Sequence, residues 1–113
     1  MDVDEIGRRL RHEWDAEDGF LTPLRWGECG PARAERFLSL LRSIDPADPA
    51  VFDRRIVGPM FLMPYYMLSH LQNSESLGVD TRAGRAVLYE ALDLIGRIVA
   101  GGEGQSGGDR VDR

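Results

Sequence analysis

The stretch that decides the fold is Ile56-Val57-Gly58-Pro59-Met60-Phe61-Leu62-Met63-Pro64-Tyr65-Tyr66-Met67-Leu68-Ser69-His70-Leu71. It is the only long segment of the 113-residue chain without Asp, Glu, Lys or Arg, and it contains three of the four methionines and two of the three tyrosines. A helix that is apolar on every side must be covered on every side. The stretch therefore predicts the central helix of a small all-α domain, with the other helices packed around it.

Two prolines allow more than one first residue for this central helix. Gly58-Pro59 predicts a break or bend after a preceding helix that begins at Pro49, because proline favours the first helical position. Pro64 has no N–H to donate to the carbonyl of Met60, so a helix that begins near Pro59 is kinked there. We favour one kinked helix over a helix that begins at Pro64.

Apolar residues at spacings of three and four predict three further helices. They cover residues 2–15, residues 31–44, and a segment that opens at Asp80 or Thr81 and ends at Ala100. The loop between the first two helices carries apolar side chains that we expect to pack on the core, namely Phe20, Leu21, Leu24 and Trp26.

Together these elements predict an all-α fold, a compact bundle of four to five helices around a buried, proline-containing central helix. A chain of this length has room for one hydrophobic core, so we expect a single helical domain over residues 1–102. Residues 103–113 are rich in glycine and polar side chains, which predicts a flexible C-terminal tail.

The composition excludes several classes of partner. The net charge of −5 argues against nucleic-acid binding, which requires a basic surface. The apolar stretch is shorter than the roughly 20 residues that cross a bilayer, and the acidic N-terminus does not have the pattern of a signal peptide. Cys29 is the only cysteine, which fits a reducing compartment. We therefore expect a cytoplasmic protein with no membrane partner.

No pattern in the sequence indicates catalysis or metal binding. His12 and His70 are far apart, and no pair of histidines, cysteines or acids has the spacing of zinc ligands. His70 has no nucleophile or carboxylate that a spacing rule places beside it, as a general base requires. We expect no catalytic residue, no metal and no cofactor, and hence a protein that is not an enzyme.

The central helix nevertheless offers a possible pocket. Its methionines adapt easily to a ligand, and its tyrosines and histidine would supply polar groups. The residues are Met63, Tyr65, Tyr66, Met67 and His70. The same spacing is typical of a buried helix face, and we favour that interpretation.

The two tryptophans suggest a partner-binding surface instead. They flank an acidic segment, and tryptophan is enriched in the residues that dominate binding energy at interfaces. An acidic surface with aromatic anchors suits a basic protein, since opposite charge steers the encounter. The residues predicted to bind this partner are Glu13, Trp14, Asp15, Glu17 and Trp26. The alternative is that both indoles belong to the core.

Three hypotheses about function follow. The first is a protein–protein interaction module that binds a partner stoichiometrically; small acidic immunity proteins, which neutralise a cognate toxin, have this general size and charge, although no shared motif links them to this chain. The second is a small-molecule-binding or catalytic bundle with a pocket beside the central helix. The third is a homodimer that buries an exposed apolar stripe.

Overall fold

The fold is all-α, as the sequence predicts, in a computed structural model that describes residues 2–101. The elements are α1 (Val3–Asp15), α2 (Leu21–Leu24), α3 (Pro31–Arg42), the 3-10 helix η1 (Pro49–Phe52), α4 (Arg54–Ser76) and α5 (Arg82–Ala100). No strand occurs among these residues. Residues 103–113, for which we expect a flexible tail, lie outside the described part of the chain.

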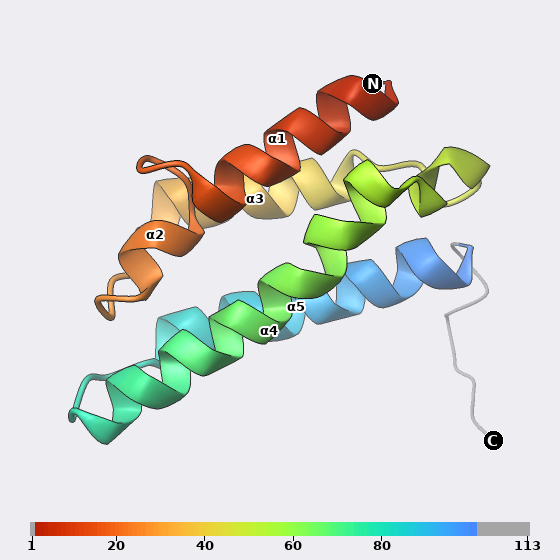
Figure 1. Ribbon diagram of the computed structural model, residues 1–113. Coiled ribbons are helices and arrows are strands. Elements are labelled where there is room, and N and C mark those ends of the chain that lie inside the picture. The colour runs from red at the N-terminus through yellow and green to blue at the C-terminus, as the bar shows by residue number, and fades with distance from the viewer. Residues whose placement is uncertain (1, 102–113) are drawn as a thin grey trace, which may run out of the picture.

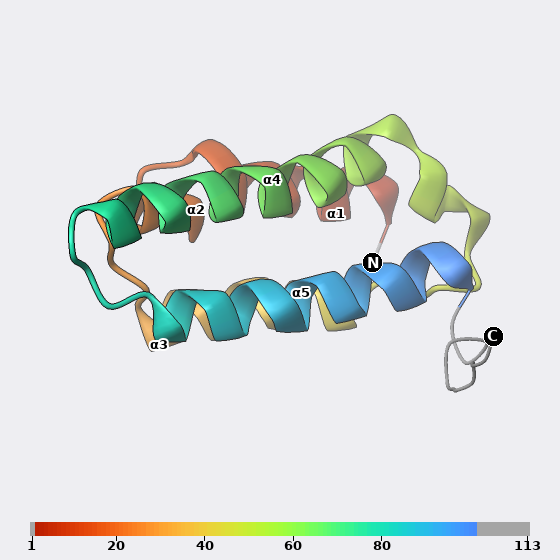
Figure 2. The same ribbon diagram turned by 90° about the horizontal axis from the view of Figure 1, so that it is seen from below.

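The helices form two layers (Figures 1 and 2). Helices α1, α2 and α4 lie in one layer, and α3 and α5 lie in the other. Helix α4 contacts α1, α2, η1 and α5, so it holds the central position predicted for it. The largest fully buried side chains come from four of the helices and from the start of α2, and they are Phe20, Phe37, Leu10, Leu24, Leu41, Ile56, Met60, Met63, Met67 and Leu71.

Local sequence signals set the helix boundaries. The carboxylate of Asp2 accepts a hydrogen bond from the backbone N–H of Glu5 at 2.8 Å, which caps α1. Helix α3 begins at Pro31, as predicted. Helix α5 ends at Ala100 because Gly101 adopts the left-handed conformation, with φ of 93°.

Of the break or bend predicted at Gly58-Pro59, the break does not occur, and one helix contains both prolines, as favoured. Instead of the helix expected from Pro49, only the 3-10 helix η1 forms there. Helix α4 begins at Arg54, and its N-cap is Asp53, whose carboxylate accepts a hydrogen bond from the N–H of Arg55 at 2.9 Å. The helix then continues through both prolines. Each proline removes one helical hydrogen bond, and the ribbon of α4 bends along its first half (Figure 1).

The prediction that α4 is covered on every side is wrong. One face of the helix is buried in the core, at Ile56, Pro59, Met60, Met63, Met67, Leu71 and Ser74. The opposite face is exposed although it is apolar. The other helices cover α4 from one side only, and no further helix of the described residues is present to cover the other (Figure 2).

Candidate interaction surface

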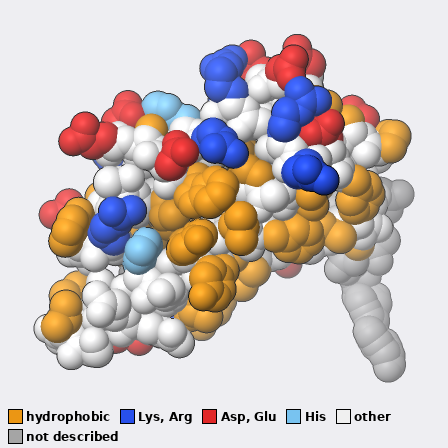
Figure 3. Space-filling model, viewed as in Figure 1, with side chains coloured by type: hydrophobic (Ala, Val, Ile, Leu, Met, Phe, Trp, Pro, Cys, Tyr) orange, Lys and Arg blue, Asp and Glu red, His pale blue; other side chains and the backbone are white. Residues whose placement is uncertain are grey.

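The exposed side of α4 carries five large apolar residues. These are Phe61, Leu62, Tyr65, Tyr66 and Leu68, and we call them the outer α4 face. Figure 3 shows hydrophobic side chains gathered in a band across the middle of this side of the molecule. Tyr65 protrudes furthest, with 66% of its surface exposed. A continuous apolar surface of this kind marks an interaction site more often than it occurs by chance on a monomer.

Helix α5 extends this surface along its seam with α4. The two antiparallel helices are joined by an ion pair in which Arg85 donates from Nη2 to Oε1 of Glu75 at 2.7 Å. Residues seven positions apart lie on the same side of a helix, so the residues seven and fourteen positions from Glu75 in α4 and from Arg85 in α5 lie along the same seam. In α4 these are Leu68 and Phe61, and in α5 they are Leu92 and Val99; all four are exposed.

An aromatic cluster continues the outer α4 face toward α1. The rings of Tyr65 and Tyr66 meet edge to face with centroids 5.3 Å apart, and Tyr66 stacks on Trp14 at 6.1 Å. The guanidinium of Arg11 lies 5.6 Å above the indole of Trp14. Tyrosine, tryptophan and arginine are the residues that most often dominate binding energy at interfaces.

No charged residue lies between Ile56 and Ser74 of α4. The nearest acid is Glu75 at the end of the helix, where hydrogen bonds from Arg85 and Thr81 lower the pKa of its carboxyl to about 2. This acid is therefore neutralised by a basic neighbour at the edge of the surface. The centre of the outer α4 face is apolar and electrically neutral.

Glu13 does not lie on a partner-binding surface, contrary to the sequence prediction. Its surface is only 3% exposed, and it sits between α1, α3 and the start of α2. Its Oε1 accepts from the N–H of Phe20 at 2.9 Å, and Arg36 donates to both carboxylate oxygens at 2.6 and 2.9 Å. The carboxylate thus joins three segments of the fold, which no spacing within α1 could reveal.

The other residues predicted to bind a partner are at least partly accessible. Asp15 and Glu17 are exposed, Trp14 is half-buried against Tyr66, and Trp26 is 72% exposed. The expectation that Trp26 packs on the core is wrong, whereas Phe20, Leu21 and Leu24 are buried as predicted. Trp14 is the predicted residue that joins the outer α4 face.

The five residues considered for a pocket beside α4 do not share one environment, and the favoured interpretation of a buried helix face holds for Met63 and Met67. Met63 and Met67 are completely buried in the core, while Tyr65 and Tyr66 point away from it on the exposed side. His70 is half-buried, and burial together with the nearby charge of Arg25 lowers the pKa of its imidazole. These five residues do not converge on one cavity, because they lie on opposite sides of the helix.

Sequence analysis missed most of this surface. Phe61, Leu62 and Leu68 belong to the stretch that the sequence predicts to be covered on every side, and the helical period of the last helix does not separate exposed Leu92 and Val99 from its core residues. Their apolar character gave no signal of exposure.

Residues 2–101 contain no group of three or more His, Cys, Asp or Glu side chains placed to hold a metal ion. Within the same residues no helix is both long enough and apolar enough to cross a membrane. No family model, curated protein or solved structure matches the chain.

Proposed function

We propose that this protein is a protein–protein interaction module, and that the occupant of its outer α4 face is a second copy of the same chain. The observation that carries the proposal is the exposed apolar surface of α4 and α5. The arguments for the second copy are the size, the neutrality and the shape of that surface.

The size of the surface suits a dimer. It comprises the outer α4 face together with three exposed residues of α5, which are Tyr89, Leu92 and Val99. Since a whole aromatic side chain has about 150–250 Å² of surface, their fractional exposures leave roughly 700 Å² accessible. A specific interface of standard size buries about 800 Å² on each partner. The apolar residues alone therefore supply most of the area that a dimer needs.

The charge distribution also favours a second copy. A chain with a net charge of −5 repels itself, so two copies can meet only where the acids are absent or paired. The stretch from Ile56 to Ser74 meets this condition, because it contains no charged residue. Burying it against the same stretch of another copy leaves no unpaired charge at the centre of the interface.

The helical shape of the surface permits a twofold arrangement. Across a twofold axis each patch contacts its own copy, so α4 packs against α4. Phe61, Tyr65 and Leu68 recur at spacings of four and three, which places them in one stripe along the helix, as in helices that pack side by side. Tyr65 would lie near the axis, because it is central in this stripe and is the most exposed of the three.

A basic partner at the acidic end of α1 has weaker support. Of the acids predicted to meet it, Glu13 is buried and paired with Arg36, while Asp15 and Glu17 remain exposed. Arg11 lies 3.9 Å from the carboxylate of Asp15 and reduces the negative charge there. The outer α4 face is larger and more uniform in character.

The test is the mass of the purified full-length chain in solution, measured by sedimentation equilibrium from low micromolar to submillimolar concentration. We expect twice the mass of one chain at the highest concentration.

Tyr65→Glu places two carboxylates across the twofold axis and should give a monomer with an unchanged circular dichroism spectrum. The matched control is Leu77→Glu, at an apolar residue that is 74% exposed just beyond α4; it should remain dimeric. A wild-type chain that is monomeric at every concentration overturns the proposal.

A further inference from the structure

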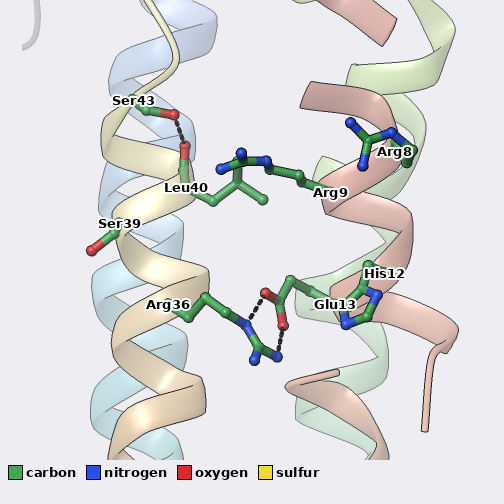
Figure 4. Close-up of a pocket in the computed structure, with 8 residues that line it drawn as sticks. All are labelled: Arg8, Arg9, His12, Glu13, Arg36, Ser39, Leu40 and Ser43. Carbon is green, nitrogen blue, oxygen red and sulfur yellow. Dashed lines mark hydrogen bonds and ion pairs between the residues drawn. The ribbon is translucent and has the colours of Figure 1, made fainter. Parts of the chain in front are cut away.

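A groove runs between α1 and α3, separate from the outer α4 face. Its volume is about 580 Å³, within the range of small-molecule sites. Eight residues line it, and Figure 4 shows them projecting from the two facing helices: Arg8, Arg9, His12, Glu13, Arg36, Ser39, Leu40 and Ser43. Three of the eight are arginines and one is an acid, although the whole chain is acidic.

The one acid that lines the groove, Glu13, already accepts hydrogen bonds from within the protein. Both oxygens of Glu13 accept hydrogen bonds from Arg36, and one of them also accepts from the N–H of Phe20. Arg36 is held in turn, because its Nη2 also donates to the carbonyl of Asp18 at 2.7 Å. Its Nη1 donates to no residue within 2–101, so a fixed guanidinium retains free N–H groups at the groove. Such a preorganised donor loses little entropy when it binds an anion.

Arg9 supplies a second guanidinium from the opposite helix. Its side chain extends from α1 across the groove toward Leu40 of α3 (Figure 4). Arg9 and Arg8 share one carboxylate, that of Glu5, at 2.7 and 3.0 Å. One acid therefore serves two arginines, which leaves an excess of positive charge on this side of the groove.

The two sides of the groove together recognise a particular chemistry. Guanidinium groups bind carboxylate and phosphate oxygens through paired hydrogen bonds. The hydroxyl of Ser39 already donates to Oε2 of Glu35 at 2.9 Å, so the further contact on the α3 side is the apolar side chain of Leu40, between Arg36 and Ser43. We propose that the groove binds a small organic anion, with its carboxylate or phosphate group at the guanidinium of Arg9 and its apolar part against Leu40.

The test uses amide NMR spectra of the full-length protein at low ionic strength, titrated separately with inorganic phosphate and with benzoate. Either probe should cause saturable shifts confined to residues of α1 and α3 that line the groove. Tighter binding of benzoate would assign the head group as a carboxylate beside an apolar contact, and tighter binding of phosphate would assign it as a phosphate.

Matched arginine variants separate the site from general attraction of anions. Arg9→Gln should weaken binding about tenfold, as expected for the loss of a charge-assisted hydrogen bond. Arg11→Gln removes the same charge from the same helix outside the groove and should leave the affinity unchanged. Arg36 is unsuitable as the lead variant because its loss would also unpair Glu13. The proposal is overturned if neither probe gives saturable shifts in the groove, or if both variants weaken binding equally.

Discussion

Glu13 is an acid that the sequence pattern predicts at the surface and that the fold buries. It belongs to an acidic segment, yet its side chain is buried and receives hydrogen bonds from Arg36 of α3 and from the N–H of Phe20. A buried carboxylate is tolerated only when it is paired and hydrogen-bonded. Glu13 therefore fastens α1 to α3 and to the start of α2.

Replacing Glu13 should weaken the fold strongly. Glu13→Ala removes three hydrogen bonds, leaves Arg36 without its partner and leaves the N–H of Phe20 unsatisfied, so we expect a loss of about 2–4 kcal/mol in the free energy of unfolding. Urea denaturation measures the loss. Glu17→Ala, at an exposed acid of the same segment, is the control and should change stability by less than about 0.5 kcal/mol. Equal effects of the two substitutions would contradict the role of Glu13.

At the scale of the element, α4 is defined by its two internal prolines. Pro59 has no N–H for the carbonyl of Arg55, which would be its partner in a regular helix. Gly7 of α1 lies directly against this part of α4, since a Cβ at Gly7 would lie 3.1 Å from the Arg55 carbonyl oxygen and 3.0 Å from its Cβ. The close approach of α1 to α4 thus depends on the absence of a side chain at residue 7.

Two helical glycines should therefore respond oppositely to alanine. Gly96→Ala, in α5, meets no atom within 4 Å and should gain up to about 1 kcal/mol of stability from helix propensity. Gly7→Ala should lose stability instead, because overpacking against backbone costs about 1–3 kcal/mol and exceeds that gain. Thermal unfolding of the two variants checks the contrast. A stabilised Gly7→Ala protein would show that α1 and α4 separate without penalty.

The ion pair between α4 and α5 should make stability depend on acid pH. The pKa of Glu75 is lowered from 4.5 to about 2 by Arg85 and Thr81. A carboxylate whose pKa is depressed in the folded state stabilises the fold above its unfolded pKa, and this stabilisation is lost as pH falls through the folded pKa. Unfolding free energy should fall between pH 4.5 and about 2, and it should fall less steeply in Glu75→Gln. Glu17→Gln provides the same charge change without the ion pair and should retain the wild-type slope; an unchanged slope in Glu75→Gln would contradict the assignment.

At the scale of the whole molecule, two layers of helices bury one side of α4 and expose the other. The core is built from both layers, whereas the exposed apolar residues of α4 and α5 keep a large part of their surface in water when the single chain folds. Such residues lower the solubility of a monomer and are stabilised only when another surface covers them.

The proposed dimer predicts that thermal stability depends on protein concentration. Association stabilises the folded chain by mass action, so Tm should rise as the concentration of the wild-type protein is raised. Tyr65→Glu should abolish this dependence, and Leu77→Glu should preserve it. Differential scanning calorimetry over a wide concentration range makes the measurement. A wild-type Tm that does not vary with concentration would count against the dimer.

The sequence by itself determined the helices and most of their buried faces. Helical period, capping and proline position act over a few residues, so the starts and ends of α1, α3 and α5 were predictable to within two residues, as was the burial of Phe20, Leu21 and Leu24. The same local signals misplaced the start of α4, because a proline within a helix and a proline that begins one look alike until neighbouring helices fix the chain.

Only the tertiary structure decided which apolar and charged residues are accessible. Glu13 can be buried because it pairs with Arg36, which lies 23 residues away in the chain. No local sequence pattern predicts a contact between residues so far apart. The outer α4 face is exposed because the other helices all lie on one side of α4. The α1–α3 groove likewise exists only where two distant helices face each other. Burial depends on what covers a residue, and the covering residues come from elsewhere in the chain.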